Sequence, residues 1–160
     1  MTDTLTLPAY AYKLTERPGA GPLIWDIVRR QHVACTPEEW VRQHVIHYLT
    51  GHLRYPTSLL SIERGTGARG QRTDLRAYNP ATGQPALLVE CKAPHIRLTP
   101  AVLQQAQRYW QRVPAAFIII TNGITHACWQ VGPPVQMWER FPAWEELLLP
   151  PAGASAPAGA

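Results

Sequence analysis

Residues 86–94 read ALLVECKAP, and this stretch decides which fold the rest of the chain has to fit. Its apolar half predicts a buried strand, and this strand runs directly into Glu90, Cys91 and Lys92. Carboxylate and ammonium groups are side chains that the end of a buried strand would ordinarily avoid. Because side chains alternate along a strand, Glu90 and Lys92 should share one face. Cys91 should point to the other face and pack there as a small hydrophobe.

A second acid, Asp74, precedes this strand at the start of another predicted strand, residues 72–78. The two strands are joined by residues 79–85, which have the composition of a turn. If the strands are neighbours, Asp74, Glu90 and the backbone carbonyl of Cys91 offer the oxygen ligands that Mg²⁺ prefers. The ammonium of Lys92 would then hold a water molecule beside the metal, an arrangement suited to phosphodiester hydrolysis. The pattern leaves one alternative open, an ordinary surface ion pair between Glu90 and Lys92.

The same start signal predicts a helix on either side of these strands. Thr36 and Pro37 supply an N-cap and a first helical residue, and Glu39 at the N3 position completes a capping box. Apolar residues at helical spacing extend this helix to about residue 53. Residues 99–100, again Thr-Pro, begin the second helix. A short helix at 143–149 is predicted to close the domain.

The remaining elements are strands, and together they predict a mixed α/β sheet. The run 116–121 is apolar throughout, as expected of a strand covered on both faces. Asn122-Gly123 is a hairpin signal between this strand and the next. The second helix links two apolar strands, which favours a parallel crossover. Further strands are predicted at residues 10–14, 23–28, 58–63 and 124–131.

Composition restricts the class of protein. Charged residues make up 16% of the 160 residues, below the roughly 25% of ordinary soluble proteins, and the net charge is +4. The three cysteines include no Cys-x-x-Cys, which argues against a disulfide framework or a structural zinc site. No apolar stretch approaches the ~20 residues of a membrane helix, and residues 1–8 do not resemble a signal peptide. We therefore expect a cytoplasmic protein that does not contact membranes.

Several of these motifs together resemble the PD-(D/E)xK nuclease superfamily. Asp74 and Glu90-x-Lys92 match its core, and Gln105 and Tyr109 match the Gln-x-x-x-Tyr element of one branch. The chain is most similar to the N-terminal nuclease domain of type I restriction enzyme R subunits. That closer resemblance rests on residues 36–42 (TPEEWVR), 88–94 (LVECKAP) and 121–123 (TNG).

The resemblance implies a restriction-endonuclease-like core: a helix, a three-stranded antiparallel meander, a second helix, and further strands in a mixed central sheet. It implies a bacterial Mg²⁺-dependent endonuclease of a restriction-modification system that cleaves DNA, with Mn²⁺ able to replace Mg²⁺. Asp74 and Glu90 would bind the metal ion, and Lys92 would serve the attacking water. Gln105 would line the site and orient the acids, and Tyr109 would contact the DNA backbone. The resemblance covers about residues 36–130, and with the composition of the flanking segments it predicts three parts: an N-terminal strand-rich extension (1–35), the nuclease-like domain (36–149) and a disordered tail (150–160).

The family also places a glutamate of its first helix near the metal. Glu38 shares a helix face with Val41 and Val45, whereas Glu39 is explained as the capping partner of Thr36, so Glu38 is the preferred candidate.

A second expectation concerns the arginines just before the site. Arg69 and Arg72, with Arg64 and Arg76 nearby, form either a solvated loop or a patch that steers phosphates, and the adjacent site favours steering.

The chain departs from the family pattern at two points. Thr73 replaces the Pro of the Pro-Asp dipeptide, which leaves Asp74 in place. The sequence also contains no Gly-x-x-x-x-Gly-Lys-Ser/Thr phosphate loop, so we expect no helicase motor.

A motor or specificity subunit is therefore an expected partner, unless the chain acts as a small independent nuclease or a homodimer. Two other functions remain open. One is a docking module for nucleic acid or protein that retains the nuclease fold without catalysis. The other is an interaction protein unrelated to nucleic acid.

Overall fold

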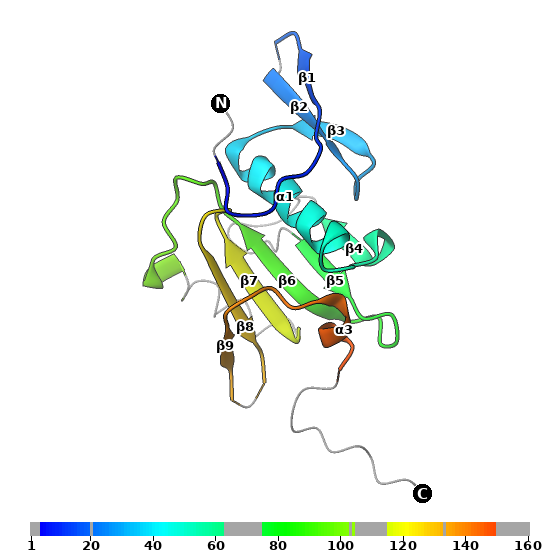
Figure 1. The fold of residues 1–160 in the computed structure, drawn as a ribbon, viewed down its shortest axis with the longest axis vertical. Coiled ribbons are helices and arrows are strands. Elements are labelled where there is room, and N and C mark those ends of the chain that lie inside the picture. Colours follow the sequence, from blue (N-terminus) through cyan, green and yellow to red (C-terminus); the bar gives the residue numbers. More distant parts are fainter. Residues whose placement is uncertain are drawn as a thin grey trace, which may run out of the picture.

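A computed structural model describes residues 4–19, 21–62, 75–102, 104, 115–132 and 134–149. These residues form two sheets, one of three strands and one of six, with helix α1 lying across the larger sheet (Figure 1). No helix among them is long and apolar enough to cross a membrane.

The larger sheet has the mixed topology that the sequence predicts. Its strand order is β4-β5-β6-β7-β8-β9, with β6 and β7 parallel and every other pair antiparallel. Strands β4 to β6 form the predicted meander, and the predicted α/β core of the restriction-endonuclease type is confirmed. The strands are β4 (Leu60–Ile62), β5 (Leu75–Tyr78), β6 (Pro85–Cys91), β7 (Phe117–Thr121), β8 (His126–Gln130) and β9 (Gln136–Trp138).

Helix α1 (Pro37–Gly51) covers one face of this sheet. Val41, Val45 and Leu49 recur at helical spacing and are fully buried. They pack in one core with alternate residues of the strands, including Leu87 and Val89 of β6. A 3₁₀ turn (Thr57–Leu59) follows the helix and leads into β4, and the closing helix is α3 (Trp144–Leu147).

The opposite face of the sheet has a separate and smaller core. Leu88 of β6 packs there with Ile118 and Ile120 of β7. Leu98 and Val102, at the start of the predicted second helix, lie against this core. Residues 100–102 and 104 are helical, which agrees with the predicted start at Pro100. Apolar packing on both faces explains why β7 is apolar and buried along its whole length.

The N-terminal extension is a three-stranded antiparallel sheet, one strand more than the two predicted at residues 10–14 and 23–28. Its strands are β1 (Leu14–Arg17), β2 (Gly21–Asp26) and β3 (Gln31–Ala34). Strand β3 was missed because QHVA has little apolar character and forms by pairing with β2. Strand β9 was also missed, since it is short and Met137 is 72% exposed.

The predicted hairpin at Asn122-Gly123 is confirmed as a loop of residues 122–125 between β7 and β8. The Asn122 carboxamide oxygen accepts hydrogen bonds from the backbone N–H groups of Ile124 and Thr125. Gly123 has a φ of +80°, and a Cβ there would lie 2.7 Å from Leu5 Cδ2 and 3.2 Å from Val41 Cγ2. The N-terminal segment and α1 therefore both pack closely against this turn.

We expect Gly123→Ala to lower the free energy of unfolding by about 2–4 kcal/mol in urea denaturation, because it adds a steric clash to an unfavourable backbone conformation. The matched control is Gly83→Ala, since Gly83 has a φ of +68° but nothing within 4 Å of its Cβ position. That variant should lose about 1 kcal/mol, the conformational cost alone. Equal losses in both variants would show that Leu5 and Val41 do not constrain the turn.

Candidate active site

The charged pair lies where the sequence predicts it, at the carboxyl end of buried strand β6. Lys92 Nζ is 2.6 Å from Glu90 Oε1, and the side chains are 30% and 29% exposed. The ion pair of the alternative interpretation is therefore present, but it is partly withdrawn from solvent. A pair so placed is accessible to a substrate while its charges are only partly screened by water.

The backbone around this pair is held by the neighbouring parallel strand. Glu90 lies opposite Ile120 and Cys91 opposite Thr121 in the β6–β7 ladder. The Lys92 backbone N–H donates to the Thr121 carbonyl at 2.8 Å, which extends the pairing past the end of β6. The pair therefore stands on regular sheet rather than on a free loop.

Strand alternation assigns Glu90 and Lys92 to one face of the sheet. Leu88, two residues before Glu90, belongs to the core that includes Leu98 and Val102. Cys91 is fully buried on the other face, in the core beneath α1, which confirms the predicted packing of its side chain. The candidate site thus opens on the face away from α1, where the second helix begins.

Five of the predicted site residues lie outside the described residues: Asp74, Gln105, Tyr109, Arg69 and Arg72. The same holds for Arg64 and for the predicted tail 150–160. The register nevertheless places Leu75, which follows Asp74, opposite Val89, which precedes Glu90. The predicted pairing of the two strands, β5 and β6, is therefore confirmed at the residues next to the two acids.

Glu38 and Glu90 lie on opposite faces of the sheet. Both are near the end of the sheet at which strands β6 and β7 finish. Val41, one turn further along α1, packs against Gly123, and the loop that contains Gly123 follows β7 at the edge where β6 also ends. The Glu38 side chain is 46% exposed and pairs with Arg42 at 3.0 Å. Among the described residues, Glu38 thus makes its ion pair within α1 and not with Lys92.

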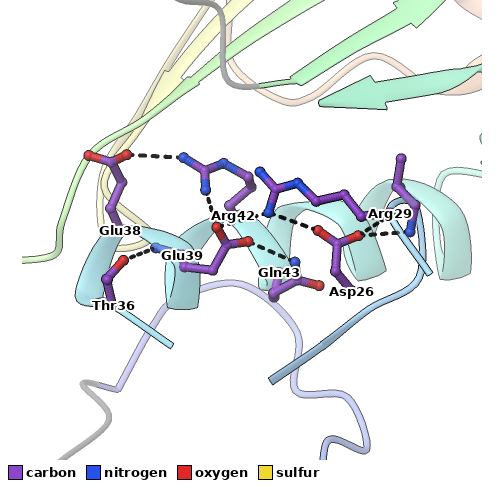
Figure 2. A network of polar contacts seen from close by, with 8 residues as sticks. Asp26, Arg29, Thr36, Glu38, Glu39, Arg42 and Gln43 are labelled. Atoms are coloured by element: carbon purple, nitrogen blue, oxygen red, sulfur yellow. Dashed lines mark hydrogen bonds and ion pairs between the residues drawn. The ribbon is translucent and has the colours of Figure 1, made fainter. Parts of the chain in front are cut away.

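Glu39 has a different role from the predicted one (Figure 2). Thr36 Oγ1 accepts a hydrogen bond from the Glu39 backbone N–H, as a capping box requires. The reciprocal bond is replaced, since the Thr36 N–H donates to the Ala34 carbonyl. The Glu39 carboxylate instead accepts from Arg29, from Arg42 and from the side chain of Gln43, the last at 2.8 Å. The expected capping box is therefore only half formed.

These residues belong to a buried charge network that sequence reasoning missed. Asp26, which is fully buried, accepts hydrogen bonds from the backbone N–H groups of Val28 and Arg29 at 2.8 Å. The Arg29 guanidinium lies 3.2 Å from both Asp26 and Glu39 and so joins the β2–β3 turn to α1. Asp26 at the start of a turn was a readable signal, but its link to Glu39 depends on tertiary packing.

A cavity of about 240 Å³ lies on the α1 side of the sheet, away from Glu90. His126 stands at its wall, held at 2.7 Å from Thr121 Oγ1 and 3.0 Å from Thr6 Oγ1. Burial lowers the pKa of His126 below its usual value. The ring contacts a hydroxyl group of β7 and one of the N-terminal segment, and it therefore links the two.

The donor set at the end of β6 fits a hard cation. Glu90 supplies a partly exposed carboxylate, and the Cys91 backbone lies at the same strand end. Within the described ranges, no three His, Cys, Asp or Glu side chains gather into a metal-ligand group, and Asp74 is not in those ranges. Mg²⁺ often takes only one or two protein carboxylates and fills its other positions with water and phosphate oxygens. The oxygen atoms of Glu90 and of the Cys91 backbone are of the kind that Mg²⁺ takes as ligands.

The family model described as type I restriction enzyme R protein N terminus matches residues 37–142. No curated protein matches the chain. The match begins at the first residue of α1 and ends after β9, so it includes the whole six-stranded sheet and the Glu90–Lys92 pair. The β1–β3 sheet precedes the matched range.

Proposed function

The chain belongs to the family of type I restriction enzyme R protein N-terminal domains, and on that premise we propose that it is a metal-dependent endonuclease that hydrolyses phosphodiester bonds of DNA. The observation that carries the proposal is the Glu90–Lys92 pair, with 2.6 Å between charged atoms at the end of a buried strand. A carboxylate and an ammonium group so placed can serve a metal ion and a water molecule at once.

The proposed ligands of the metal are the carboxylates of Asp74 and Glu90 and the backbone carbonyl of Cys91. A Mg²⁺ ion held there would lower the pKa of a bound water and polarise a phosphoryl oxygen. The Lys92 ammonium, fixed beside Glu90, would donate a hydrogen bond to the attacking water and offset the charge that develops on the phosphoryl oxygens. The Lys92 backbone bond to Thr121 fixes the main chain from which this side chain extends.

Two further groups complete the proposal. Gln105 and Tyr109 lie one helical turn apart in the sequence, and we assign them to orienting the acids and contacting the DNA backbone. Arg69 and Arg72 are proposed to steer phosphates toward the site. Glu38, at the same edge of the sheet, is proposed as the helix acid of the site.

DNA is the proposed substrate, and a motor or specificity subunit is the proposed protein partner. The support for the partner is the family, whose description names one protein of a restriction enzyme. Supercoiled plasmid incubated with the chain alone would test whether cleavage requires that partner.

Glu90→Gln is expected to abolish detectable nicking of supercoiled plasmid in Mg²⁺ or Mn²⁺, because the amide removes the charge that binds the metal. Mn²⁺ affinity measured by calorimetry should fall at least about tenfold, the effect of losing one of few ligands. The matched control is Glu139→Gln, an exposed glutamate near the end of β9, which should leave both measurements unchanged.

Three outcomes would contradict the proposal. Nicking by the wild-type chain in EDTA would rule out a metal-dependent reaction. Nicking that survives Glu90→Gln at the wild-type rate would place the active site elsewhere. If neither cleavage nor Mn²⁺ binding occurs with any DNA, the docking module becomes the better interpretation.

A further inference from the structure

The β1–β3 sheet has two faces of different character. Register pairs Trp25 with His32 and Leu23 with Ala34, so these residues share one face with Thr15 and Arg17 of β1. Ile24 and Asp26 point to the other face, and both are buried, at 1% and 0% exposure. We call the face of Arg17, Trp25 and His32 the outer face.

Trp25 is the main apolar group of the outer face and is 44% exposed. The His32 ring contacts the indole edge-on, with 5.2 Å between ring centroids. The indole is therefore held by a neighbour on the adjacent strand while much of its surface stays open to solvent. A rigid, half-exposed aromatic ring on a strand is the geometry on which an unpaired nucleotide base stacks.

The charges around Trp25 favour an anionic partner. Arg17 lies on the outer face, Lys13 directly precedes β1, and Arg30 stands exposed in the turn between β2 and β3. Within residues 4–35, setting aside Ala20, which is not described, the only acids are Glu16 and Asp26. Register assigns Glu16 to the inner face, and Asp26 is buried against Arg29. The outer face thus carries basic groups without a carboxylate of its own among the described residues.

The sheet is fixed to the domain by its inner face. Arg29 joins Asp26 to Glu39 of α1, with 3.2 Å to each carboxylate (Figure 2). Tyr12, just before β1, packs edge-on against Trp40 of α1 at 4.7 Å. A ligand held on the outer face would therefore be held in a fixed position relative to α1 and the larger sheet.

We propose that the outer face of the β1–β3 sheet binds an unpaired strand of DNA, with one base stacked on Trp25 and the adjacent phosphates contacted by Arg17, Lys13 and Arg30. This site is distinct from Glu90 and Lys92, and it lies before the matched range of the family model. Its binding requires no metal, so it can be tested whether or not the chain cleaves DNA.

The test is fluorescence anisotropy with a labelled oligonucleotide of about 12 thymidines in EDTA, using the full chain. Trp25→Ala should raise Kd roughly tenfold, since stacking on an aromatic ring contributes that order of affinity per base. Trp25→Phe keeps a stacking ring and should stay within about threefold of the wild type. Arg17→Ala should reduce the slope of log K against log salt by about 0.7, the value for one phosphate contact on a single strand.

Matched controls separate this site from general effects. Met137→Ala removes another exposed apolar side chain, on β9, and Arg54→Ala removes an exposed arginine beyond the end of α1. Both should leave Kd for the oligonucleotide unchanged.

Three results would overturn the proposal: duplex DNA bound as tightly as the single strand, equal loss in Trp25→Ala and Met137→Ala, or Trp25→Ala abolishing self-association instead of DNA binding. The last would identify the face as an interface between two copies of the chain. The anisotropy assay is run in EDTA and measures binding alone. Its outcomes therefore do not depend on whether the wild-type protein or Glu90→Gln nicks DNA.

Discussion

Lys92→Met is expected to slow metal-dependent cleavage of DNA by about 100- to 1,000-fold, the usual effect of removing one group that stabilises transition-state charge. Methionine keeps an unbranched side chain but carries no charge and donates no hydrogen bond. Lys92 is not a proposed metal ligand, so Mn²⁺ affinity should stay within a few-fold of wild type. The loss should appear in kcat with KM little changed, because the ammonium acts on charge that develops during the reaction.

The alternative interpretation of the same pair predicts a different result. A Glu90–Lys92 ion pair that is about 30% exposed contributes about 0–1 kcal/mol to stability, so breaking it should alter neither folding nor cleavage by much. Urea denaturation of Lys92→Met, run beside the cleavage assay, distinguishes the two. The control is Arg54→Met, which removes an exposed positive charge beyond the end of α1 and should leave kcat unchanged. Wild-type kcat in Lys92→Met would leave the ion pair as the better account.

The sequence was most informative where burial and alternation act together. The run 86–94 predicted both the strand β6 and the opposite faces of Glu90 and Cys91, because an apolar strand between two layers permits few other placements. The weak points were strands without an apolar pattern. QHVA of β3 and QMW of β9 are strands because a neighbour pairs with them, and that pairing cannot be read from their own residues.

In the candidate site, too, contacts within one element could be predicted, and contacts that depend on tertiary packing could not. Glu90 and Lys92 are two residues apart, so their contact follows from the geometry of a single strand. The capping box expected of Thr36 and Glu39 was also a local inference, and only its Thr36 half is formed. The Glu39 carboxylate instead binds Arg29 of the turn after β2, which only the folded chain brings within 3.2 Å.

Glu39→Ala is expected to lower the free energy of unfolding by about 3–5 kcal/mol, because Arg29, Arg42 and Gln43 each lose a hydrogen bond to the same buried carboxylate. The Glu39 and Arg42 side chains are 8% and 9% exposed and Arg29 is 18% exposed, so water can compensate only in part. The matched control is Glu38→Ala on the same helical turn. Glu38 is 46% exposed and pairs with Arg42 at 3.0 Å, so its loss should cost about 0–1 kcal/mol.

A double-mutant cycle shows whether the network acts as one unit. The buried Arg29 charge should destabilise the protein once Glu39 is removed. The loss of unfolding free energy in the double variant Arg29→Met/Glu39→Ala should then be about 1–3 kcal/mol smaller than the sum of the losses in the two single variants. Strict additivity in urea denaturation would mean that Arg29 and Glu39 act independently, and the link between the β1–β3 sheet and α1 would then rest on apolar contacts. Sub-additive losses would instead show that the contact between Arg29 and Glu39 helps to hold the N-terminal sheet against α1.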